Sequence, residues 1–253
     1  MTTKTTDGLL RPANVRADSL VVREPIDGVR RFTARDALTT VDLVRGAQWS
    51  KPRRDHWQRN RPGMYFFAST RRHVSYESLE EHSLLLILDH SQTVAAILAQ
   101  PFKLFFIRNG ERLNHVPDDL SVHHDGEQCV WDVRPYDRID GSLTRKAALT
   151  REFCRDAGFT YRVFDGISKI TRGSLEFLHA YSDARRYAPD PAAAESLRDV
   201  FEGGSTLRLA ISMLDASPRE VRMWVYHMLW MRTLSFDHDR PLSDARVLEW
   251  QEA

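Results

Sequence analysis

The chain has 253 residues, a formal net charge of +1, and a composition that is 42% hydrophobic and 28% charged. These values are typical of a soluble globular protein with one large domain or two ordinary ones. They argue against a membrane-spanning protein, because no apolar run approaches the roughly 20 residues of a transmembrane helix. A protein that coats DNA over its whole surface would be more basic. The N-terminus lacks the pattern of a secretory signal, and two cysteines are too few for a disulfide framework, so we expect a reducing, cytoplasmic compartment.

Residues 1–60 are weakly periodic, and we interpret them as an N-terminal extension with a short strand or two. The run KPRRDHWQRNR at 51–61 has five Lys or Arg residues against one Asp. Solvated surface charge and contact with phosphate or a partner both explain it, and the second makes Lys51, Arg53 and Arg54 candidate DNA contacts. Adjacent arginines recur at 30–31, 53–54, 71–72 and 185–186, and any single pair is typical of a solvated surface.

The next segments predict a mixed α/β core. Pro62-Gly63 forms a turn that leads into a strand, and a helix begins at Ser78 with Glu81 in capping-box position. Asn109-Gly110 and Asp125-Gly126 are strong hairpin signals, which predict an antiparallel meander over 102–135. A helix over 142–158 and a strand over 159–164 follow.

After residue 164 the pattern becomes helical. Four segments (173–187, 190–201, 205–215 and 217–231) have helix caps, and Pro191 and Pro218 occupy first helical positions. A strand, a turn and a second strand follow at 232–248. This order is typical of a winged helix-turn-helix, and a small helical cap is the alternative. On the last helix, Arg219 and Arg222 are candidate phosphate contacts. Met223, Trp224, Met228 and Leu229 have core character.

Acidic residues are predicted to meet at the second hairpin. Alternation along QCVWDVR at 128–134 places Asp132 and Arg134 on one strand face, and the turn at 125–126 brings Asp118 beside Asp132. Two close carboxylates repel each other unless a cation lies between them, and Mg²⁺ prefers such ligands. Glu81 on the preceding helix is the candidate third acid. Each residue alone has an ordinary alternative: a turn residue, an ion pair or a helix cap.

The order of these residues resembles the PD-(D/E)xK nuclease pattern. More specifically, HVSYESLEE, the Gln100-Pro101 pair, HVPD and VWDVRP are similar to TnsA-like endonuclease subunits of heteromeric, Tn7-like transposases. The resemblance covers about residues 62–165, and the helical tail looks like the winged-helix part of that family. It implies a restriction-endonuclease-like domain with a mixed sheet flanked by helices over 61–165 and a winged-helix-like domain over 166–253. Residues 1–60 do not match the family and stay an N-terminal extension.

The resemblance also implies a function. Glu81, Asp118 and Asp132, with the Val133 carbonyl, would hold Mg²⁺ or Mn²⁺, and the protein would hydrolyse one strand, on the 5′ side, at transposon ends. Implied partners are double-stranded transposon-end DNA, a DDE-type transposase subunit and an ATPase regulator of transposition. No membrane is implied, and the expected location is the bacterial cytoplasm, with the nucleoid.

Two residues depart from the family pattern, which usually has Glu or Gln and then Lys where this chain has Asp132 and Arg134. Arginine stays protonated, so Arg134 cannot be a general base, but it can bind phosphate and stabilise charge. This leaves two alternatives to an active transposase nuclease. One is a degenerate nuclease-fold scaffold that binds DNA and the transposase without cutting, and the other is a stand-alone repair or restriction nuclease.

Overall fold

The computed structural model describes residues 19–24, 28–33, 48–49, 62–108, 110–134 and 141–252. Their contacts form two compact units. The first unit contains the described residues up to 65, residues 73–82, and those from 94 to 166. The second unit contains residues 66–72, 83–93 and the described residues from 167 onward. The expected three-part division at residues 60 and 165 stays a prediction, and each unit is described separately below.

The first unit contains an antiparallel sheet with the strand order β2-β1-β6-β7. Its strands are β1 (Ser19–Glu24), β2 (Gly28–Thr33), β6 (Phe102–Arg108) and β7 (Glu111–His115). Strand β1 pairs with β6 over four residues, so this part of the expected N-terminal extension belongs to the same sheet as the core strands. Gly110, with φ at 78°, lies in the β6–β7 turn, where a left-handed conformation favours glycine.

A second sheet in the first unit is mixed, with the order β10-β9-β8-β5. It consists of β5 (Val94–Ala99), β8 (Asp119–His123), β9 (Gln128–Val133) and β10 (Thr160–Phe164), and β10 is parallel to β9. The two predicted hairpins therefore exist, but the predicted meander is wrong because β6–β7 and β8–β9 belong to different sheets. The hairpin signals are local and do not specify which neighbouring hairpins pair.

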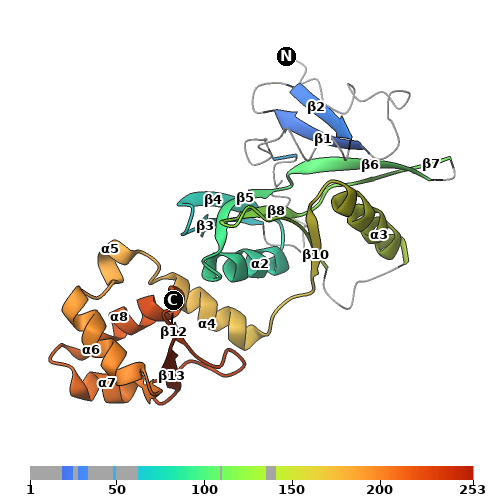
Figure 1. Cartoon of the computed structure of the whole chain (residues 1–253). Helices are drawn as coiled ribbons and strands as arrows, with labels where there is room; N and C mark the ends of the chain where they lie inside the picture. The colour runs from blue at the N-terminus through green and yellow to red at the C-terminus, as the bar shows by residue number, and fades with distance from the viewer. Residues whose placement is uncertain are drawn as a thin grey trace. The chain divides into compact units, whose positions relative to one another are not determined.

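Helix α3 (Gly141–Asp156) lies beside β10 in Figure 1 and covers the mixed sheet. It ends before Gly158, whose φ of 72° fits the predicted glycine stop. The α3 residues Leu149, Phe153 and Cys154 form one buried cluster with Leu120 of β8 and Val130 of β9. The α/β class with a mixed sheet flanked by helices is thus confirmed.

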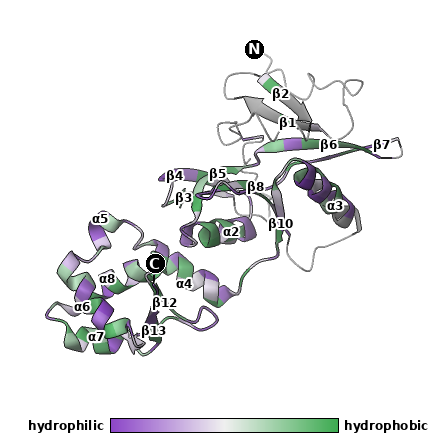
Figure 2. Cartoon of the chain, in the orientation of Figure 1, coloured by the Kyte–Doolittle hydropathy of each residue, from purple (hydrophilic) through white to green (hydrophobic). Residues whose placement is uncertain are grey.

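Strands β3 (Gly63–Phe67) and β4 (Arg72–Tyr76) form a two-stranded ribbon, and α2 (Leu79–His90) follows. One half of the predicted capping box forms, because the Glu81 amide donates to Ser78 Oγ at 3.1 Å. The Glu81 carboxylate accepts from the amide of Glu77, the residue before the cap, at 2.6 Å. The helix is strongly apolar, as Figure 2 shows, and Leu84, Leu85 and Leu86 are fully buried. Such a helix is expected where packing surrounds it on all sides.

The C-terminal part of the second unit contains five helices and a small sheet. The helices are α4 (Lys169–His179), α5 (Ala184–Tyr187), α6 (Pro191–Phe201), α7 (Leu207–Met213) and α8 (Pro218–Trp230). The predicted helix over 173–187 is therefore wrong in extent, because α4 ends at His179 and Asp183 caps a separate α5. Pro191 and Pro218 lie at helix N-termini as predicted.

Strands β11 (Ser205–Thr206), β12 (Leu234–Ser235) and β13 (Val247–Trp250) form a sheet in the order β11-β13-β12. Trp230 of α8, Phe201 of α6 and Leu248 of β13 share a buried core. Of the expected core residues, Met228 and Leu229 belong to it, Trp224 packs against it while partly buried, and Met223 is only partly buried and lies outside it. No helix in the described part of the chain combines the length and the apolar character needed to cross a bilayer.

Candidate active site

The β8–β9 hairpin positions the acidic residues of the first unit. Its register pairs Asp119 with Trp131 and Leu120 with Val130, and Gly126 adopts φ 88° in the turn. Asp118 directly precedes β8, and its amide donates to the Trp131 carbonyl at 3.0 Å. The chain therefore passes Asp118 beside the end of β9, where Asp132, Val133 and Arg134 lie. The predicted juxtaposition of Asp118 and Asp132 follows from this local pairing.

Asp118 is largely buried and bound by two donors. Its Oδ2 accepts from the Val133 amide at 2.7 Å and from Arg134 Nη1 at 2.9 Å. Burial raises the pKa of Asp118, the Arg134 guanidinium lowers it, and the Asp132 carboxylate raises it, with a net rise. Asp118 is therefore an acid whose ionised form depends on a nearby cation.

Asp132 has different partners. His115 Nε2 donates to both carboxylate oxygens at 2.8 Å, and the Tyr161 hydroxyl donates to Oδ2 at 2.6 Å. Burial alone would raise the pKa of Asp132, but the hydrogen bonds and charge of His115 and the Tyr161 hydroxyl hold it below the usual value. Its side chain is only 4% exposed. Asp132 is thus a buried carboxylate that stays ionised and is fixed in orientation.

Glu81 is the third predicted acid. Both oxygens serve the α2 cap, because Oε2 accepts from the Glu77 amide at 2.6 Å and Oε1 accepts from Ser78 Oγ at 3.0 Å. Burial raises the pKa of Glu81 to about 7 despite these hydrogen bonds, and the charges of Asp118 and Glu77 add to the rise. The capping interpretation is therefore correct for Glu81, but its charge also interacts with Asp118.

Asp119, the other member of the aspartate pair, is buried in β8 with 2% exposure. Burial raises the pKa of Asp119 well above its usual value, and the charges of Glu81 and Asp118 raise it further. Its Oδ1 accepts no hydrogen bond from any described residue. A buried carboxylate oxygen without a protein donor is protonated or contacts water or a cation. Because its charge interacts with those of Glu81 and Asp118, Asp119 belongs to the same acidic cluster.

Arg134 lies at the end of β9, and its amide donates to the Phe164 carbonyl at 2.9 Å. Its guanidinium Nη1 donates both to Asp118 Oδ2 and to the carbonyl of Val133. These are two of the atoms that the nuclease pattern assigns to a metal ion. In this structure the positive charge between them is the guanidinium itself.

The donor chemistry of the site fits a hard divalent cation, since Glu81, Asp118, Asp119 and the Val133 carbonyl offer oxygen atoms. Burial, and in second place the neighbouring carboxylates, raises the pKa of Glu81, Asp118 and Asp119, so a cation beside them would favour their ionised forms. The side chains are nevertheless not arranged as a complete metal-binding site. No three His, Cys, Asp or Glu side chains within the described ranges lie close enough together to hold one ion.

His115 and Tyr161 are the site residues that the sequence reasoning missed. His115 ends β7, two residues before Pro117, and Tyr161 lies in β10 opposite Val130. Burial and the Asp132 carboxylate raise the pKa of Tyr161, so its hydroxyl stays a donor. No sequence signal pairs β10 with β9 or turns His115 toward Asp132, so these contacts could not be predicted.

The predicted DNA contacts have different environments. Arg219 is exposed on α8. Arg222 is instead paired with Asp244 through Nη2 and donates to the Pro218 carbonyl, so the expected free arginine is engaged within the second unit. Lys51, Arg53 and Arg54 lie outside the described residues.

Comparison with protein-family models gives no match, and comparison with curated proteins gives none either.

Proposed function

We propose that the chain is a metal-dependent DNA endonuclease subunit of a transposase, with a PD-(D/E)xK-type site built by Glu81, Asp118, Asp132 and Arg134. The observation that carries this proposal is the register of β8 and β9, which places Asp118 against the Asp132-Val133-Arg134 segment. Glu81 near the start of α2 and Asp132 in β9 supply the other two carboxylates of the proposed site. The family resemblance adds the order of the motifs and suggests a winged-helix role for α7, α8 and the β12–β13 ribbon.

Within this proposal, Glu81, Asp118, Asp132 and the Val133 carbonyl would hold Mg²⁺ or Mn²⁺. The ion would lower the pKa of a bound water and stabilise charge on the scissile phosphate. His115 and Tyr161 keep Asp132 ionised and oriented through their hydrogen bonds. These two residues act on Asp132 and are positioning residues.

Arg134 has a separate role in the proposal. Its guanidinium now bridges Asp118 and the Val133 carbonyl, and a phosphate oxygen is an equally good partner for it. When a DNA phosphate draws Arg134 away, Asp118 Oδ2 and the carbonyl become available as ligands. Binding of DNA and binding of the cation are then linked, and each strengthens the other.

The contact between the Arg134 guanidinium and Asp118 also favours a second function, that of a scaffold that does not cut DNA. If the guanidinium stays on Asp118, it neutralises that carboxylate permanently and no ion binds. The chain would then bind DNA and a partner transposase through other surfaces. Affinity for Mn²⁺ separates the two functions, because a scaffold has none that depends on Asp118.

The proposed function is tested by strand cleavage of transposon-end DNA with Mg²⁺ or Mn²⁺, in the presence of the DDE-type transposase and the ATPase regulator. We expect Asp118→Asn and Asp132→Asn to remove cleavage while the chain still folds. The matched control is Asp125→Asn, since Asp125 lies exposed in the turn of the same hairpin. Full cleavage by the Asp118→Asn variant would rule out the assigned site.

A further inference from the structure

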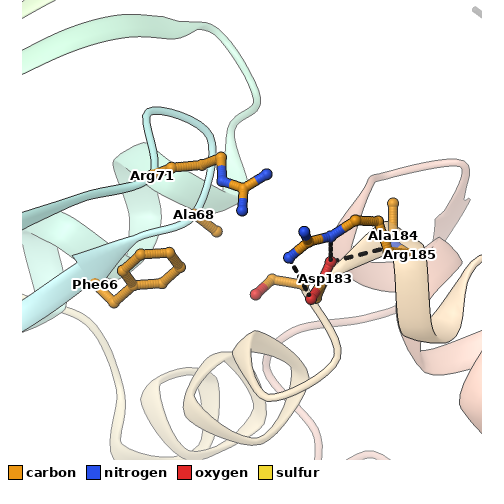
Figure 3. Close-up of a pocket in the computed structure, with 7 residues that line it drawn as sticks. Phe66, Ala68, Arg71, Asp183, Ala184 and Arg185 are labelled. Atoms are coloured by element: carbon orange, nitrogen blue, oxygen red, sulfur yellow. Dashed lines mark hydrogen bonds and ion pairs between the residues drawn. The ribbon is translucent and has the colours of Figure 1, made fainter.

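The second unit contains a pocket of about 240 Å³ that includes two arginines far apart in the sequence. Arg71 comes from the turn between β3 and β4, and Arg185 comes from α5. The pocket is also lined by Ser182, Asp183 and the ring of Phe66. Figure 3 shows the two guanidinium groups pointing toward one another across the pocket.

Positive charge in this pocket exceeds negative charge. Arg185 is paired with Asp183 at 3.1 Å, and Arg186 approaches the same carboxylate at 3.9 Å. Within the described part of the chain, the guanidinium of Arg71 makes no ion pair or hydrogen bond, and Arg72 beside it is exposed. Asp183 offsets the charge of Arg185, so the lining keeps the net positive charge of Arg71, which favours a further anion in the pocket.

The backbone at Arg71 gives an independent indication. Arg71 has φ at 56°, a left-handed conformation that glycine adopts easily and that other residues adopt at an energetic penalty. Its amide donates to the Ala68 carbonyl, which closes the turn. An arginine at a turn position that glycine would occupy without penalty motivates the hypothesis that its cationic side chain has a binding role.

Buried groups hold both sides of the pocket in place. Asp89, which is fully buried, accepts from the amides of Ala68 and Ser69 at 2.7 and 3.0 Å and so fixes the β3–β4 turn. His179, at the end of α4, donates to the Phe66 carbonyl at 2.9 Å and thereby connects that turn to the segment leading to Arg185. A charged site fixed in this way loses little entropy when its ligand binds.

We propose that this pocket binds a backbone phosphate of double-stranded DNA, with Arg71 and Arg185 as its charged contacts. The pocket is smaller than sites for drug-sized ligands and lined by charge, which suits one anionic group. Arginine presents a planar fork to phosphate oxygens, and Phe66, 40% exposed, offers an apolar edge next to it. The choice of DNA as the source of this phosphate rests on the proposed function, but the site uses none of the acidic residues around Asp118 and would bind DNA whether or not the chain cuts it.

The test compares Arg71→Gly, Arg185→Ala and a control in full-length protein, using a random-sequence DNA duplex over a range of salt concentrations. Arg240→Ala is the control, because Arg240 is similarly exposed (66% against 70%) and pairs with Asp237 as Arg185 pairs with Asp183. We expect each pocket variant to weaken binding on every DNA sequence and to reduce the slope of log affinity against log salt by about one. The control should leave both unchanged.

Thermal unfolding of the same variants separates binding from structure. Glycine suits φ 56°, so Arg71→Gly should unfold at an equal or higher temperature although it binds DNA less well. Unchanged DNA affinity and salt slope in both pocket variants would overturn the proposal. A lower unfolding temperature for Arg71→Gly in parallel with weaker binding would also overturn it, since the arginine would then be structural. Polyglutamate that binds the pocket more tightly than DNA would assign it to an acidic protein, and inorganic phosphate that does so would assign it to a free anion.

Discussion

Replacing Glu81 by Gln tests the acidic cluster without changing its shape. Glutamine keeps an oxygen acceptor for the α2 cap and removes the charge. The pKa of Glu81 is raised from 4.5 to about 7, mainly by burial, so the folded state disfavours the ionised form. A rise of this size corresponds to about 3 kcal/mol, and partial exposure to solvent reduces it to about 1–3 kcal/mol.

The raised pKa of Glu81 determines how folding stability changes with pH. Below pH 4.5 Glu81 is protonated in both the folded and unfolded states, and its contribution to stability is fully present. As the pH rises toward and through about 7, the unfolded state ionises first and this stability is lost. The wild-type chain should therefore lose stability relative to Glu81→Gln over this range. Asp118 and Asp119, with raised pKa values, act in the same direction.

Denaturant unfolding of both proteins at about pH 5 and about pH 8.5 measures the effect. We expect a small difference at the lower pH and an advantage of about 1–3 kcal/mol for Glu81→Gln at the higher pH. Added Mn²⁺ should stabilise the wild type and not the variant, by binding the folded state alone. Glu80→Gln, in the same helical turn, is the control. Equal stability of wild type and Glu81→Gln at both pH values would refute the reasoning about a strained acidic cluster.

Three further predictions concern neighbouring groups. Without metal, Arg134→Ala should lower the free energy of unfolding by about 1–3 kcal/mol, because Asp118 loses its cationic partner. The same variant should bind Mn²⁺ about tenfold more tightly in calorimetry, and unchanged affinity would contradict the bridging role of Arg134. Tyr161→Phe should reduce stability at neutral pH by about 1.5–3 kcal/mol, because it removes a donor to ionised Asp132, and the loss should shrink at low pH, as denaturant unfolding would show. Ser217→Ala should lower the stability of the second unit by about 1 kcal/mol in thermal unfolding, by removing the α8 capping box.

Much of the fold could be predicted where the signal is local. The caps at Ser78 and Ser217, the turn at Gly126 and the glycine after α3 all depend on residues within one turn of each other. The antiparallel pairing of β8 and β9 followed from the turn between them, and this pairing placed Asp118 beside Asp132.

Long-range pairing was not predictable in the same way. Strand β1 pairs with β6 across about 80 residues of chain, and the parallel alignment of β9 with β10 crosses a whole helix. His115 and Tyr161 reach Asp132 only through these pairings. The binding partner of Arg134 could not be predicted either, because strand alternation fixes the face on which a long side chain lies but not the group that it contacts. Here its partner is Asp118.

The central claim is that the acidic residues around Asp118 bind a divalent cation. Calorimetric titration of the full-length chain with Mn²⁺, with and without duplex DNA, tests it most directly, with Asp118→Asn as the matched variant. We predict binding by the wild type that strengthens when DNA is present and that Asp118→Asn abolishes. Heats that are the same for wild type and Asp118→Asn, with and without DNA, would contradict the claim and leave the scaffold function in its place.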